Sequence, residues 1–345
     1  LVGLKSGTLN SNLTVVAALA DNGSLDQTSV DVQGTAQFQN GEVRIRDLAE
    51  PVRNIRAQLR VKGQQVTLEN TGLQLGDVEL LADGTVDWEE GYNLSAQIPE
   101  VSLSAVQTLA KLELPENLPV DAAAPFKLST QVTGPLDAPN VRGRLANLTP
   151  LQVDKVRLAT ATADFVLPLT DFKLEEFELT ELRLVPDAGG VILAQGQVDL
   201  SNLKDPSFTL TGTANLPADR FAQLYGTTLP PDTVIGQLTA SLEAEGTFET
   251  QTAFAQWQLS ESTFPGQGEL TLADNRLVID NTQLRVADGT VTANGIALLD
   301  SGDWQAALAT NDVPVERFTP QAQGLLSANL DASGNLYELN LAKIE

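Results

Sequence analysis

The chain has 345 residues, of which 42% are hydrophobic but only 5% aromatic, and its 45 acidic and 21 basic residues give a net charge of −24. The absence of His and Cys removes the usual ligands of zinc, iron and copper and the common nucleophile systems of hydrolases. The strong negative charge repels nucleic acid. The composition therefore predicts a protein that is not an enzyme, carries no cofactor or metal, and binds no nucleic acid.

The beginning of the chain shows neither a start methionine nor a secretory signal, so we interpret the chain as a segment of a longer protein. Its longest strongly apolar run, 13–20, has eight residues, whereas a membrane-spanning helix needs about 20. Any membrane anchor is therefore expected outside this segment. The polar residues that follow the run, Asp21, Asn22 and Asp26, are interpreted as turn residues.

The next stretch has the pattern of two strands joined by a turn. Apolar residues alternate with polar and basic ones from Ile55 to Val61, so the apolar side chains should share one face of a strand. Gly63 should then turn the chain into a second strand, which contains Val66 and Leu68. One face of this hairpin is predicted to be apolar and the other wet.

Six basic residues gather within 19 positions of this region. Their alternation places most of them on the outward face, where we expect a solvated stripe paired with neighbouring acids. Contact with anionic headgroups or with a partner protein is the alternative. The six are Arg44, Arg46, Arg53, Arg56, Arg60 and Lys62.

The chain repeats itself with an offset of 211 residues. The stretch that contains Asn281 and Gly295 matches, without a gap, the stretch that contains Asn70 and Gly84. In both stretches a small residue and a polar residue precede the glycine, and a gapped third copy, 189–200, has Gly196 at this position. We interpret these three short segments as turns that connect one strand to the next.

Short helical caps are predicted after the copies, over 100–112, 215–221 and 312–318, and the last two contain a proline and an acid–Arg pair. Glycines spaced at about 100 residues mark the starts of larger units. These glycines are Gly23, Gly134, Gly246 and Gly334. The predicted repeat units are 1–112, 113–222, and 223–345 with the start of a fourth.

Because a strand and its turn take about 10 to 12 residues, roughly 30 strands are expected, with helix only as short caps. The sequence thus predicts an all-β fold, an elongated repeat array of antiparallel strands. Five acids in the middle of the chain alternate with apolar residues, which indicates a solvated strand edge and not paired catalytic carboxylates or a calcium loop. They are Asp171, Glu175, Glu176, Glu178 and Glu181.

The stretch from Gly41 to Asp77 and the recurrent form "VTGPLDAPNVRGRL" resemble the TamB branch of the AsmA-like envelope proteins, which includes a chloroplast relative. The resemblance covers nearly the whole chain as a pattern, and a few positions carry it. These are Leu48, Pro51, Val52, Asn54 and Ile55 in a link between strands, and Gly134, Pro135, Leu136 and Pro139 in a hairpin.

The resemblance implies that the sheet is curled into a taco-like groove with an apolar inner surface. It implies a place in the periplasm of a diderm bacterium, or in the equivalent plastid intermembrane space, with a tether to the inner membrane that lies outside this segment. The implied partners are phospholipid acyl chains and an outer-membrane barrel-assembly protein, and the implied function is to hold or conduct phospholipid between the two membranes. The residues expected to line the groove are Ile55, Leu59, Val61, Val66, Leu68, Leu73, Leu75, Leu277, Ile279, Leu284, Val286 and Val291.

Other interpretations stay open. The array could be a scaffold or chaperone-like module for outer-membrane protein assembly that offers strand edges to client strands. The apolar face could also be an ordinary packed core. A carbohydrate-active enzyme would need two carboxylates that converge on a cleft, and no carboxylate pair recurs in such a setting.

Overall fold

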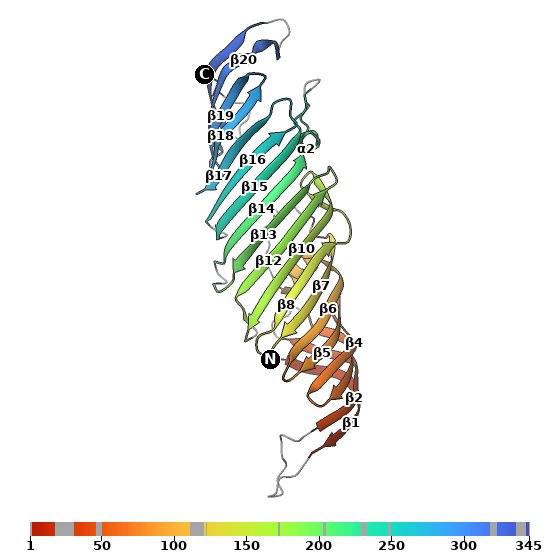
Figure 1. Ribbon diagram of the computed structural model, residues 1–345. Coiled ribbons are helices and arrows are strands. Elements are labelled where there is room, and N and C mark those ends of the chain that lie inside the picture. The colour runs from red at the N-terminus through yellow and green to blue at the C-terminus, as the bar shows by residue number, and fades with distance from the viewer. Residues whose placement is uncertain are drawn as a thin grey trace. The chain divides into compact units, whose positions relative to one another are not determined.

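The computed structural model of the chain is all-β, and its described part holds two short helices and one 3-10 turn (Figure 1). It describes residues 2–17, 31–45, 50–110, 121, 123–171, 173–202, 205–228, 233–247, 250–317, 323–335 and 343–344. The predicted turn residues Asp21, Asn22 and Asp26, together with Gly23 and Arg46, therefore lie outside the described residues.

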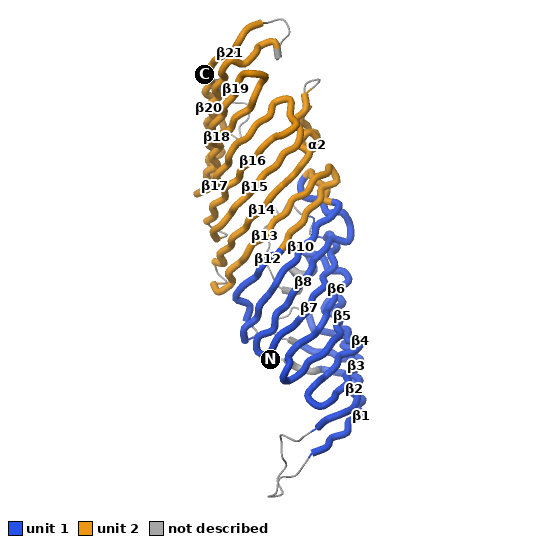
Figure 2. The backbone as a smooth tube through the Cα atoms, in the orientation of Figure 1, with its two compact units in different colours: residues 1–154, 159–180 blue, residues 155–158, 181–345 orange. Residues whose placement is uncertain are grey.

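The chain divides into two compact units (Figure 2). Unit 1 consists of residues 1–154 and 159–180, and unit 2 of residues 155–158 and 181–345. The three repeat units read from the sequence stay a prediction about the sequence pattern.

Unit 1 is an antiparallel sheet in which each strand pairs with the next one in the described chain, from β1 to β8, and β8 pairs with β10. Its elements are β1 (Val2–Val16), β2 (Asp31–Ile45), β3 (Val52–Lys62), β4 (Gln65–Leu75), β5 (Val78–Asp87), β6 (Gly91–Ser102), α1 (Leu103–Ala110), β7 (Pro125–Gly134), β8 (Asn140–Asn147), β9 (Leu151–Val153) and β11 (Lys173–Leu174). The division between the units falls within β10 (Val156–Thr170) and β12 (Glu176–Pro186). The predicted hairpin of β3 and β4 is confirmed, with its turn at Gly63.

Unit 2 is built in the same way, with neighbouring strands paired antiparallel from β13 to β22. Its elements are β13 (Val191–Asp199), β14 (Ser207–Pro217), α2 (Ala218–Leu224), β15 (Gln237–Thr247), β16 (Gln251–Ser260), β17 (Gly266–Ala273), β18 (Arg276–Val286), β19 (Gly289–Leu298), β20 (Asp303–Pro314), η2 (Val315–Arg317), β21 (Leu325–Asn335) and β22 (Lys343–Ile344). The described strands are mostly 8 to 15 residues long, so the expectation of roughly 30 strands was too high.

Turns were expected at the three repeated segments that end in Gly84, Gly196 and Gly295, and this prediction is wrong. Gly84 lies inside β5 and pairs with Leu94, Gly196 lies inside β13 and pairs with Leu210, and Gly295 lies inside β19. At Gly84 the backbone φ is +136°, and an added Cβ would collide with the carbonyl of Asn93 on the next strand. Glycine is needed here because two strands approach each other closely, and not because the chain reverses.

The repeated asparagines instead mark β-bulges inside strands. Asn70 and Asn281 have φ of +51° and +50°, and the pairing register shifts at each of them. Asparagine tolerates this left-handed conformation better than other non-glycine residues do. The extra residue resets the alternation, so Leu73 and Leu284 face the same side as the apolar residues before the bulge.

In neither unit is the sheet closed or strongly curled, so the expected taco-like curl is corrected to an open sheet. Few apolar side chains in the described residues are buried, and they are Val52, Val78, Val101, Ala124, Leu151, Leu158, Ala161, Val286 and Val313. Among the described residues of each unit, the sheet therefore has no second layer that would turn one face into an ordinary core.

Candidate functional site

The seven predicted lining residues of unit 1 all lie on one face of its sheet. Residues that oppose each other across an antiparallel ladder point to the same side, and Leu59 opposes Leu68 while Val61 opposes Val66. The same relation places the remaining three on this face: Ile55 opposes Gly41, Leu73 opposes Leu80, and Leu75 opposes Val78.

The five predicted residues of unit 2 also share a face. Leu277 opposes Leu272, Ile279 opposes Leu270, and Leu284 opposes both Gly266 and Val291. Val286 lies on the same face opposite Gly289 but is only 3% exposed. Val286 is therefore buried at the end of its strand and is not an accessible part of the lining.

We call these two surfaces the apolar faces. At the paired ladder positions of β2–β8 and of β13–β21, the register places no Asp, Glu, Lys or Arg on this side of either sheet. All charged ladder residues of these strands point to the other side, which we call the polar face. An open sheet needs one wet face to stay in water, but it does not need the other face to be wholly uncharged.

Most side chains of the apolar faces are half-buried by their neighbours in the same layer, and some are fully accessible. Leu242 and Ile279, well inside unit 2, are 37% and 36% exposed, and on β1 of unit 1 Leu9 is 61% exposed. The apolar faces therefore present exposed apolar side chains to solvent in both units.

Large aromatic rings lie across glycines on the apolar faces. In unit 2, Gly268 opposes Trp257, and a Cβ added to it would come within 2.7 Å of the indole ring. In unit 1, Gly143 opposes Phe165, whose ring likewise occupies the space of the missing Cβ. The glycines therefore let bulky rings settle onto the sheet instead of standing out from it.

The predicted helical caps are confirmed at α1, α2 and η2. In α2 the Asp219 carboxylate accepts hydrogen bonds from the backbone N–H groups of Ile235 (2.6 Å) and Gly236 (2.9 Å), and these bonds lower the pKa of Asp219. The Arg220 guanidinium donates to the carbonyl oxygen of Ala188 at 3.1 Å. The acid–Arg pair thus fastens the cap to the ends of neighbouring strands, as predicted for a structural element.

Two of the six predicted basic residues, Arg56 and Arg60, form ion pairs on the polar face of unit 1, as expected for a solvated stripe. Arg60 on β3 pairs with Glu69 on the neighbouring strand β4 at 3.1 Å. Arg56 on β3 pairs with Glu79 on β5, one strand further, at 2.9 Å. All four side chains are largely exposed, so each pair contributes at most about 1 kcal/mol.

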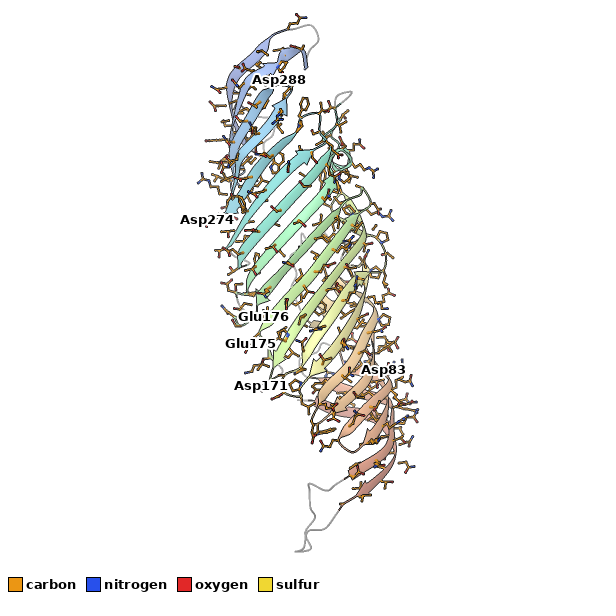
Figure 3. All side chains as sticks on the ribbon, viewed as in Figure 1. Asp83, Asp171, Glu175, Glu176, Asp274 and Asp288 are labelled. Atoms are coloured by element: carbon orange, nitrogen blue, oxygen red, sulfur yellow. The ribbon has the colours of Figure 1, made fainter. Side chains whose placement is uncertain are left out.

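The acidic run also lies at the surface. Asp171, Glu175 and Glu176 are exposed and follow the rim of the sheet without converging (Figure 3). Within the described residues, no group of three or more acidic side chains is arranged to hold a metal ion. The described helices are all too short or too polar to cross a lipid bilayer.

Sequence reasoning missed a feature of the polar face of unit 2. Phe254 on β16 points to this face, between Glu243 and Thr271 on the neighbouring strands, and is 38% exposed. Next to it lies a hollow of about 660 Å³ that is lined by amide and hydroxyl side chains, the Glu269 carboxylate and the apolar side chains of Val191 and Leu193. The alternation of β16 predicts the orientation of Phe254, but only the register shows what surrounds it.

No protein-family model, curated protein or solved structure matches the chain.

Proposed function

We propose that the apolar faces bind the acyl chains of phospholipids, and that the protein is a non-enzymatic cell-envelope component that holds or conducts phospholipid between an inner and an outer membrane. The observation that carries the proposal is the uncharged ladder surface on one side of both sheets, part of which is exposed to solvent. The resemblance to the TamB branch supports the same class of ligand. A periplasmic location, an anchor outside this segment and a barrel-assembly partner belong to this proposal.

The energetics of an open face suit transient binding. Complete burial of an acyl chain yields about 0.8 kcal/mol per methylene, and a sheet that is not strongly curled covers a chain from one side only. A sixteen-carbon chain would then gain on the order of 5 kcal/mol, roughly half the value for full burial. This gain is large enough to retain lipid on a repeated surface and small enough to let it exchange between neighbouring positions.

The glycine–aromatic pairs support movement along such a surface. If Trp257 and Phe165 stood upright, each ring would block a chain that lies on the face. Because each ring occupies the Cβ space of the glycine opposite, the surface stays more even. An even, uncharged surface without a deep pocket is what a ligand needs in order to slide.

Lipid extraction from the purified chain followed by mass spectrometry tests the proposal. We expect phospholipid to copurify with the native chain, and we expect Leu59→Glu together with Ile279→Glu to reduce the amount by severalfold. The matched control is Gln58→Glu together with Gln283→Glu, which adds the same charges on the polar face. Gln58 is the residue next to Leu59, and Gln283 lies on the same strand as Ile279, beyond the bulge. A native chain free of lipid, or equal loss in both variants, would contradict the proposal.

A scaffold for client strands is the second candidate, and the edge strand β1 favours it. In the described residues β1 pairs only with β2, and its apolar-face side chains Leu9, Leu13 and Val15 are 61%, 45% and 61% exposed. A long apolar edge is a template for strand addition. Photocrosslinkers on β1 should then capture a client strand. Val15→Pro, which removes a backbone N–H that points away from β2, should abolish the capture.

A further inference from the structure

The polar face of unit 2 departs from that of unit 1 in its aromatic and charged content. Phe254 is the one aromatic side chain that the ladder register of the described strands β13–β21 places on this face. Its exposed fraction, 38%, is close to those of Leu242 and Ile279 on the apolar face of the same unit. An exposed aromatic ring among polar side chains offers a flat apolar surface on which a ligand can stack.

Hydrogen-bonding side chains surround this ring on adjacent strands. A hollow of about 330 Å³ includes Phe254, Glu243 and Thr252. The larger hollow of about 660 Å³ follows along the same strands and draws its lining from β13 to β18. Its polar lining consists of Thr213, Asn215, Thr239, Ser241, Gln256, Gln258, Gln267, Glu269 and Asn281.

Part of this lining is held in place by its own hydrogen bonds. The Glu269 carboxylate accepts from Gln256 Nε2 at 3.0 Å and from Asn281 Nδ2 at 2.6 Å. Asn281 is the left-handed bulge residue, so the backbone bulge turns its amide toward Glu269. An ionised carboxylate still has lone pairs for further donors, and each amide oxygen can accept as well.

The charge of this surface limits the ligand. The strands β13–β17 contain no Lys or Arg, whereas Glu243, Glu245 and Glu269 all point to this face. On β18 the register places Arg276 and Arg285 on the same face. The excess of acids over β13–β17 disfavours anionic ligands there, and a lipid chain would leave the amides without hydrogen-bond partners. A neutral ligand with many hydroxyl groups matches the lining, because hydroxyls donate to carboxylates and both donate to and accept from amides.

We propose that the polar face of unit 2 binds a neutral oligosaccharide, with the C–H side of a sugar ring on Phe254 and the hydroxyls on the amides and carboxylates around Gln256 and Glu269. The open form of the two hollows suits an extended chain of sugar rings, since strands about 4.8 Å apart repeat the same kind of donors and acceptors. This surface lies opposite the apolar face, so it adds a second ligand and does not depend on lipid binding.

Calorimetric titration of the full chain with cellohexaose, chitohexaose and maltohexaose tests the proposal. We expect at least one of them to bind with a dissociation constant on the order of 1 mM or below, with little change between low and high salt. Phe254→Ala should weaken binding roughly tenfold, and Gln256→Ala should weaken it as well. Leu298→Ala, which removes another exposed apolar side chain of the same face (44% exposed), should leave binding unchanged.

Three results would overturn the proposal. The first is that the native chain binds none of the three sugars. The second is that the two site variants, with an unchanged thermal unfolding temperature, bind as tightly as the native chain. The third comes from a parallel titration with polylysine: if polylysine binds, the sugars do not, and high salt abolishes the binding, the surface is an acidic site for cationic peptides.

Discussion

Unit 1 and unit 2 keep the same apolar face and differ in the polar one. On both apolar faces the ladder positions are uncharged, and bulges at Asn70 and Asn281 preserve the alternation. On the polar face, β3 and β4 of unit 1 pair Arg60 with Glu69, whereas β16–β18 of unit 2 join the Glu269 carboxylate to the amides of Gln256 and Asn281.

This difference separates what the fold requires from what it allows. A polar face only has to be solvated, and arginine–carboxylate pairs and amide–carboxylate bonds both satisfy that requirement. An uncharged face that stays partly exposed is not needed for solvation, and its presence in both units is the basis of the proposal that it binds lipid. The predictions below test that contrast, from the largest expected effect to the smallest.

A charge at the buried end of the apolar face should have the largest effect. Val286→Asp in unit 2 and Val78→Asp in unit 1 bury an unpaired carboxylate, because these side chains are 3% and 7% exposed, and each should lower the free energy of unfolding by about 3–5 kcal/mol. Ile279→Asp, at a side chain 36% exposed, should cost less than about 1 kcal/mol. Denaturant titration measures all three, and equal losses at Val286 and Ile279 would mean that the apolar face is uniformly buried.

The next largest loss of stability is expected when a glycine under an aromatic ring is replaced by alanine. Gly268→Ala must displace both Trp257 and the Thr282 hydroxyl and should cost about 1–3 kcal/mol, with a shift in indole fluorescence. Gly143→Ala under Phe165 should cost a similar amount in unit 1. Double variants that also replace the ring, Trp257→Leu and Phe165→Leu, should recover part of the loss, and no recovery would show that the ring is not the cause.

The Asp219 cap of unit 2 should make a pH-dependent contribution to the free energy of unfolding. Two backbone N–H groups lower the pKa of Asp219 in the folded state, so the stability gained from its charge is present above the unfolded pKa of about 4 and is lost as pH falls through the folded pKa. Asp219→Asn should therefore destabilise the chain by about 1 kcal/mol at neutral pH. Thermal unfolding should show this difference shrinking toward pH 3, and a difference that does not change with pH would refute the charge effect.

The ion pairs of unit 1 should have the smallest effect. A double-mutant cycle with Arg60→Gln and Glu69→Gln should give a coupling of about 0.5 kcal/mol or less, and salt should reduce it. A coupling above about 2 kcal/mol would mean that the basic stripe is a structural requirement that unit 2 lacks.

The sequence predicted which side chains share a face but not the path of the chain between them. Alternation from Ile55 to Val61 depends only on strand geometry, so it could be read directly. The bulge at Asn281 could not, because a register shift depends on the partner strand as well as on the residue. For the same reason Gly84 and Gly295 were mistaken for turns: close strand approach and chain reversal both favour glycine.

Curl and burial also could not be predicted from the sequence. Whether a long sheet closes depends on the accumulated twist and on the register of every strand pair. The expected taco-like curl was therefore wrong, although the all-β fold of antiparallel strands was predicted correctly. Val286 continues the apolar alternation of β18, so the sequence pattern does not distinguish it from the exposed lining residues. Its place at the end of β18 nevertheless buries it. Phe254 likewise became a candidate ligand contact only when its neighbours Glu243 and Thr271 were known.

Site-specific photocrosslinking tests the central claim most directly. A photoreactive amino acid placed at Leu59 or Ile279 on the apolar faces, in the full chain and with phospholipid vesicles, should form covalent lipid adducts. The same amino acid at Gln58 or Asp280, one residue away on the polar faces, should form few or none. Adducts confined to the apolar-face positions of both units are the predicted result, and their absence there, or equal yields on both faces, would contradict the account.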